Sequence, residues 1–190
     1  PSHPEVAKAL DSLAWANYYE GKIEMTEKLG ERALAMQEKE LDPDHPNVAY
    51  TLHSLGYFCD YHIAQETLKG AEADVERLQA VFKKQCLLYE RCLAIRKKAQ
   101  EAKDPRWENR AGRIHKSLEE EEGETMSDLG WNYCRTIGIG YARESEKTRT
   151  TGPMREKVDK GVRLMEQALE IQNIIINVLL TQQAITSNDA

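Results

Sequence analysis

An internal repeat of 42 residues is the feature that most constrains the fold of this chain. The segment HPEVA at residues 3–7 returns as HPNVA at residues 45–49. The same register continues through three further matched pairs of positions: Leu10 and Leu52, Ser12 and Ser54, and Leu13 and Leu55. A period of this length is typical of repeat proteins, in which each unit covers its apolar face with the next unit. We therefore expect stacked repeats rather than one closed core.

A second pattern indicates that each repeat contains two helices. The segment LGERALAMQ at 29–37 returns as LYERCLAIR at 88–96 and as LMEQALEIQ at 164–172, with apolar residues on one helical stripe in each copy. Upstream of each copy, a leucine, a tiny residue and an aromatic residue follow one another: Leu13-Ala14-Trp15, Leu55-Gly56-Tyr57 and Leu129-Gly130-Trp131. The tiny residue lets a neighbouring helix approach closely, so we expect two packed helices in each repeat.

The spacing of these patterns predicts three units within a single domain at 1–190. Unit one spans 4–42, unit two spans 46–102 with an insertion at about 65–81, and unit three spans 106–186 with an insertion at about 138–153. The first insertion keeps helical spacing, so we expect it to lengthen both helices of unit two, with Gly70 near the tip. The second insertion is rich in glycine and polar residues, which favours a loop.

Turn residues predict where the first helices end and begin. Gly21 marks the turn inside unit one. In the segment LDPDHP, at 41–46, either Asp44 or His45 is available to cap the helix that Pro46 opens. Further on, we expect the acidic run at 119–122 to be a solvent-facing part of a helix or to end at a break at Gly123.

The composition argues against several classes of partner and compartment. A formal net charge of −6 and a pI near 5.5 argue against general binding to nucleic acid or to an anionic membrane surface. There is no apolar stretch of about 18 residues, so we expect no membrane insertion. The four cysteines lack CxxC spacing, which favours buried free thiols over disulfides or metal ligands and hence a reducing intracellular compartment. The chain starts at Pro1, so we expect a processed or incomplete chain.

No motif in the sequence points to catalysis. A phosphate-binding loop, HExxH and GxSxG are all missing, and the five histidines show no metal-like pairing. We therefore expect no enzyme activity, no catalytic residue, no metal site and no cofactor.

The residues quoted above resemble the tetratricopeptide repeat family, in the 42-residue form found in kinesin light chains. The segments HPNVAYTLHSLGYF and LLYERCLAIRKKA resemble the first and second helices of that repeat, and HEAT-like repeats are the architectural alternative. The resemblance implies an all-α, right-handed superhelical solenoid of antiparallel helix pairs. Asn17 stands where the family usually has an aromatic residue, Thr26 where alanine is usual and Gly30 where a large side chain is common, so we expect repeat one to be under-packed.

The resemblance also implies that the first helices line a concave face that binds partners. On that face we expect an aromatic groove for a peptide or a partner helix, made by Trp15, Tyr18, Tyr19, Tyr50, His53, Tyr57, Tyr61, Trp131 and Arg135. Trp and Tyr suit such a role because they give large contact area with few rotatable bonds. The alternative is that these rings pack against the neighbouring repeat or against the inserted segments.

The C-terminal run ALEIQNIIINVLLTQQAI, at 168–185, is apolar over more than one helical face. We expect an apolar contact there, with a further repeat, a second copy or a partner subunit, through Ile175, Ile176, Leu179 and Leu180. The alternative is that the long insertions cover these residues. The sequence thus predicts a protein–protein interaction scaffold, chiefly a structural or assembly subunit of a larger complex. An adaptor that binds a peptide in the aromatic groove is the alternative.

Overall fold

The computed structural model describes residues 4–69, 72–107 and 120–130, together with 156, 159–161, 163, 164, 166 and 167. Within those residues the regular structure is entirely helical and no strand occurs, which confirms the all-α prediction. The chain divides into two compact units, Pro1–Asn109 and Arg110–Ala190. The division into three repeat units within one domain stays a prediction.

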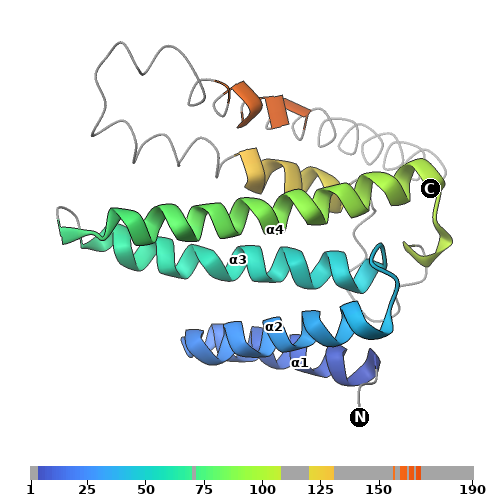
Figure 1. The fold of residues 1–190 in the computed structure, drawn as a ribbon, viewed down its shortest axis with the longest axis horizontal. Coiled ribbons are helices and arrows are strands. Elements are labelled where there is room, and N and C mark those ends of the chain that lie inside the picture. The colour runs from blue at the N-terminus through green and yellow to red at the C-terminus, as the bar shows by residue number, and fades with distance from the viewer. Residues whose placement is uncertain are drawn as a thin grey trace, which may run out of the picture. The chain divides into compact units, whose positions relative to one another are not determined.

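The first helix pair consists of α1 (Pro4–Tyr19) and α2 (Ile23–Glu40), which pack against each other (Figure 1). On α1, residues Ala7, Asp11 and Ala14 are almost fully buried and lie on one side of the helix. Gly21 has a φ of +73°, a left-handed conformation that a side chain would disfavour, so it makes the predicted turn between the helices.

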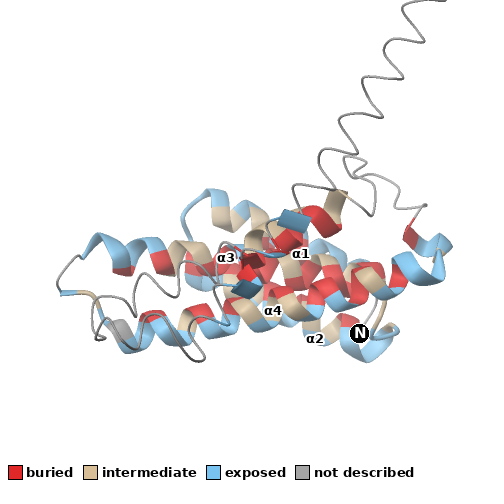
Figure 2. Ribbon diagram, turned by 90° about the horizontal axis from the view of Figure 1, so that it is seen from above, coloured by how far each residue is buried: buried red, intermediate tan, exposed pale blue. Residues whose placement is uncertain are grey.

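The second helix pair consists of α3 (Pro46–Leu68) and α4 (Val75–Ala102), which lie side by side along their length (Figure 1). A short 3-10 helix, η2 (Pro105–Trp107), follows. Both long helices run into the predicted insertion at about 65–81, which confirms that it extends the pair, while Gly70 lies outside the described residues. Much of this extension is exposed, whereas buried residues concentrate where the helices meet (Figure 2).

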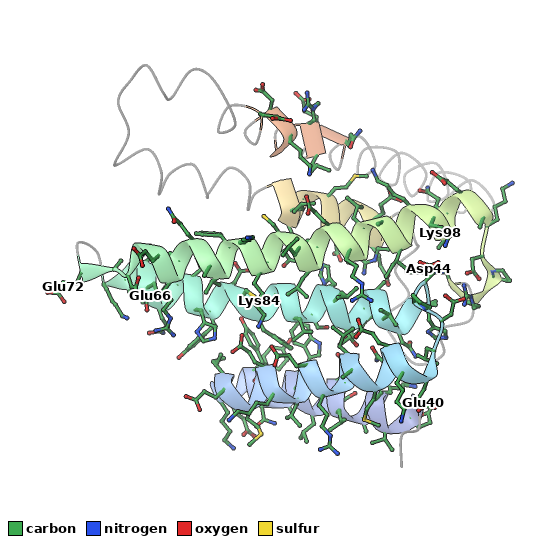
Figure 3. All side chains as sticks on the ribbon, in the orientation of Figure 1. Glu40, Asp44, Glu66, Glu72, Lys84 and Lys98 are labelled. Carbon is green, nitrogen blue, oxygen red and sulfur yellow. The ribbon has the colours of Figure 1, made fainter. Side chains whose placement is uncertain are left out.

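Both ends of the second pair are fixed by polar side chains. At the start of α3, the Nδ1 of His45 accepts a hydrogen bond of 3.1 Å from the backbone N–H of Asn47, so His45 is the cap. At the far end, the buried carboxylate of Glu66 accepts hydrogen bonds from Lys69 Nζ at 2.6 Å and from the backbone N–H of Asp74 at 3.2 Å (Figure 3). These bonds hold the ends of the two helices together.

The junction between the two pairs is tightly packed around small residues. A Cβ on Gly30 would lie 2.8 Å from Leu55 Cδ2, so Leu55 fills the space that a larger residue would take. The prediction that repeat one is under-packed at Gly30 is therefore wrong. Within the second pair, Gly56 lets Tyr89 approach so closely that a Cβ would lie 2.6 Å from the ring, which confirms the role of the tiny residue.

In the second compact unit, residues 120–130 form helix without a break at Gly123. Glu122 is 4% exposed, so the acidic run does not face solvent throughout, because Glu122 lies on the same buried side as Met126 and Leu129.

The cysteines and the apolar character of the helices can be compared with the sequence in the described residues. Cys59, Cys86 and Cys92 are free cysteines; Cys59 and Cys92 are buried as predicted, whereas Cys86 is half-buried, and Cys134 lies outside the described residues. Among the helices that the structure describes, none has the length and apolar character needed to span a bilayer.

Candidate partner-binding surface

Five aromatic residues gather where the carboxyl end of α1 meets the middle of α3. Three come from α1 and two from α3, and together they form the aromatic cluster: Trp15, Tyr18, Tyr19, Tyr57 and Phe58. Their ring centroids lie between 4.9 and 5.9 Å apart in the contacting pairs, within the range of attractive edge and offset ring contacts. The repeat pattern thus brings together residues that are 42 positions apart.

The inner part of the aromatic cluster packs one repeat on the next. The indole Nε1 of Trp15 donates a hydrogen bond of 3.0 Å to Oγ of Ser54, which is almost fully buried. The Trp15 ring meets the buried Phe58 ring edge-on at 4.9 Å, and Tyr18 stacks on Phe58 at 5.3 Å. These contacts match the alternative in which rings pack against the neighbouring repeat.

The outer part of the aromatic cluster remains open to solvent. Tyr19 is 80% exposed and Tyr57 is 40% exposed. Both rings contact Trp15, at 5.9 and 5.4 Å, so they stand on a base that the repeat junction holds in place. Burial raises the pKa of Tyr18, and the neighbouring Tyr57 raises it further, so the Tyr18 phenol stays protonated at neutral pH.

Two other predicted groove residues of α3, His53 and Tyr61, make ring contacts with residues outside this cluster. His53 is half-buried with its ring 5.5 Å from that of Tyr89 on α4, and Tyr61 is half-buried against His62 at 6.0 Å. Tyr50 is also half-buried. Six predicted contact residues lie outside the described residues: Trp131, Arg135, Ile175, Ile176, Leu179 and Leu180.

Sequence reasoning missed a second surface feature, an open groove of about 510 Å³ between α2 and α4. Apolar and cationic side chains line it: Leu34, Leu52, Ala80, Lys83, Lys84, Leu87, Leu88 and Arg91. Ion pairs join the two helices along it, from Lys84 to Glu31 and from Arg91 to Glu38. The signal in the sequence is the shared spacing of 53 residues between these opposite charges.

The match to a family model decides the classification of the first helix pair. Residues 6–47 match the tetratricopeptide repeat model, a span that includes nearly all of α1, all of α2 and the turn before α3. Residues 6–47 are similar to a tetratricopeptide repeat. The resemblance stated from the sequence is thereby confirmed for these residues, and the antiparallel pairing of α1 with α2 is the arrangement that a tetratricopeptide repeat has.

Comparison with solved structures finds similar chains, one of which is described here. It comes from Podosopora anserina and is described as nearly identical TPR-like repeats of a kinesin light chain. The sequence identity is 15% and the TM-score is 0.27, and the match covers 96% of this chain and 98% of that chain. No curated protein matches the chain. The tetratricopeptide assignment therefore depends on the family match and on the described helix pairs.

Proposed function

We propose that this chain is a non-catalytic scaffold for protein–protein interaction, and that the aromatic cluster binds a peptide or partner helix. Tetratricopeptide repeats generally mediate interactions between proteins. The observation that carries the finer proposal is the exposure of Tyr19 and Tyr57 on a base fixed by Trp15.

The physical basis of the proposal is that such rings bind at low entropic cost. A tyrosine ring held by a neighbouring ring has little freedom to lose, and it offers an apolar face with a hydroxyl at its edge. An aromatic anchor of this kind contributes about 2 kcal/mol or more when a partner covers it. The inner rings serve the site indirectly, because they keep the two exposed rings in position.

Peptide selection tests the adaptor role. Peptides are selected from a random displayed library on the purified chain, and Kd values are measured for the parent chain, Tyr19→Ala and Tyr57→Ala. Each variant should weaken binding by about tenfold or more. Leu68→Ala is the matched control, because Leu68 is 81% exposed on α3 but lies outside the aromatic cluster. Binding that withstands both tyrosine substitutions contradicts the proposed site.

The role of structural subunit stays a prediction, with one described feature in its favour. The α3–α4 pair is 23 and 28 residues long and extends beyond α1 and α2, as an architectural element would (Figure 1). Purification of the native protein under mild conditions, followed by measurement of mass and stoichiometry, tests this role. A fixed stoichiometric complex supports it, and a protein that is free of partners contradicts it.

A further inference from the structure

The two helices that form the aromatic cluster carry little positive charge. No lysine or arginine occurs in the 23 residues of α3, and α1 contains Lys8 alone. Lys8 precedes Trp15 by seven residues, which is about 10 Å along a helix at 1.5 Å per residue. The acidic residues of the same two helices are more numerous: Glu5, Asp11, Asp60 and Glu66. The aromatic cluster therefore stands on the acidic helices of the two pairs.

The lysines that border these two helices are paired with carboxylates. In the turn after α1, Lys22 Nζ lies 2.5 Å from a carboxylate oxygen of Glu20. Directly after α3, Lys69 Nζ lies 2.6 Å from the buried carboxylate of Glu66. Each of these positive charges has a negative charge beside it, so the two lysines add no net positive charge near the aromatic cluster.

Asp60 brings a negative charge to the aromatic cluster. It follows Tyr57 by three residues on α3, and side chains at this spacing are neighbours on a helix surface. Burial is the main cause that raises the pKa of Tyr18, and the negative charge of Asp60 raises it further. The half-buried Asp60 thus acts on rings from both helices.

The carboxyl end of α1 favours a positive ligand for a separate reason. Tyr18 and Tyr19 lie in the last turn of α1, where the helix dipole is equivalent to a partial negative charge. Lysine or arginine often complements this charge, but the last turn of α1 contains no basic residue. The positive end of α2 lies after the same turn, and Glu24 in its first turn opposes that positive end.

We propose that the segment bound by the aromatic cluster carries an arginine or lysine side chain, which lies on the exposed rings of Tyr19 and Tyr57 beside Asp60. The face of an aromatic ring carries partial negative charge, so it attracts a cation that lies within about 6 Å of the ring centroid. Exposures of 80% for Tyr19 and 40% for Tyr57 leave ring surface open for this contact. An acidic segment would be repelled by Asp60 and by the end of α1. The inference rests on the proposed function and names the chemistry of its partner.

The peptides selected on the parent chain provide the first test. Their sequences should be enriched in arginine and lysine relative to the unselected library. In a selected peptide whose binding depends on Tyr19 and Tyr57, replacement of its arginine or lysine by glutamine should raise the Kd by about fivefold or more. This change is made in the peptide, so misfolding of the chain cannot cause the loss. A glutamine peptide that binds as tightly as the original overturns the proposal.

Asp60→Asn tests the counter-charge, since it keeps the size of the side chain and removes its charge. The variant should weaken binding of the cationic peptide by about two- to fivefold, and should weaken binding of the glutamine peptide much less. Glu101→Gln is the matched control, because it removes the same charge from an exposed residue in the last turn of α4. Circular dichroism checks that both variants keep their helices. Equal losses in the two variants would indicate only a general attraction to a chain of net charge −6, and would overturn the proposal.

The cation site and the aromatic site fail in different ways. Binding that withstands both Tyr19→Ala and Tyr57→Ala contradicts the aromatic site, and the cation site with it. Binding that requires both tyrosines but selects peptides without an excess of arginine and lysine leaves the aromatic site in place and overturns the cation site alone.

Discussion

Trp15 and Ser54 join two successive repeats through a hydrogen bond of 3.0 Å from the indole Nε1 to the hydroxyl Oγ. Ser54 is 1% exposed, while the Trp15 ring also supports Tyr19 and Tyr57. The same indole therefore stabilises the junction and holds the exposed part of the aromatic cluster. Loss of this ring should affect stability first and binding as a consequence.

Trp15→Phe should lower the free energy of unfolding by about 1 kcal/mol, because the hydrogen bond is lost while most of the ring contact is kept. Urea unfolding followed by circular dichroism measures the change. In a Ser54→Ala background the same substitution should cost less, since its partner is already missing. Equal costs in the two backgrounds would show that the hydrogen bond contributes nothing.

Gly56→Ala should destabilise the second helix pair. The new Cβ would lie 2.6 to 2.9 Å from three atoms of the Tyr89 ring, and Tyr89 is 1% exposed. The overpacking cost of about 1–3 kcal/mol exceeds the roughly 1 kcal/mol that alanine gains over glycine in a helix. Gly30→Ala is the comparison, because its new Cβ would meet the end of the flexible Leu55 side chain. It should therefore reduce stability less than Gly56→Ala does. Thermal unfolding of both variants gives the ranking, and a Gly56→Ala chain as stable as the parent would contradict the close approach.

Lys84→Gln should weaken the link between α2 and α4. The Lys84 Nζ lies 3.0 Å from Glu31 and 3.7 Å from Glu27. Burial lowers the pKa of Lys84, but the hydrogen bond that it donates to Glu31 and the charges of Glu27 and Glu31 together raise the pKa above its ordinary value. Since the pair is partly exposed, the expected loss is about 0.5–1 kcal/mol, and it should shrink in high salt. Urea unfolding with and without added salt measures it. Lys83→Gln changes the adjacent exposed lysine and serves as the control; the same loss there would argue against the ion pair.

Stability should fall as the pH drops below neutrality, because of His45. Burial lowers the pKa of His45 below its ordinary value of 6.5, and the nearby Arg106 lowers it further. The unfolded chain then binds a proton more readily than the folded one, so the stabilising effect is present above 6.5 and is lost as the pH falls through the folded pKa. Protonation also removes the Nδ1 acceptor that caps α3.

Urea unfolding at about pH 7.5 and about pH 5.5 measures this effect. This pH range lies above the range in which carboxylates titrate. Asp42 and Asp104 have lowered pKa values, from a backbone hydrogen bond and from Arg106 respectively, so they lose their contribution only in stronger acid. His45→Asn keeps a capping oxygen without a titrating group and should flatten the dependence. A variant as pH-dependent as the parent would rule out His45 as the cause.

The sequence by itself determined the helices, their ends and their pairing in repeats. These features depend on local signals, such as the turn at Gly21, the choice of Asp44 or His45 as the cap of α3, and the apolar stripes of α2 and α4; the structure then identifies His45 as the cap. The extension of α3 and α4 was also predictable, because helical spacing continues through the insertion. Such signals act within a few residues, so they can be read without knowledge of the neighbours.

Only the tertiary structure decided which residues are packed and which are available. A helical period shows which side of α1 carries Trp15 and Tyr19, but the neighbouring α3 determines that Trp15 is held by Ser54 while Tyr19 stays exposed. Leu13 and Leu55 occupy equivalent positions in the repeat, yet they are 49% and 3% exposed. Burial of a repeat position depends on the helix that stacks against it. The sequence around that position does not show whether such a helix is present.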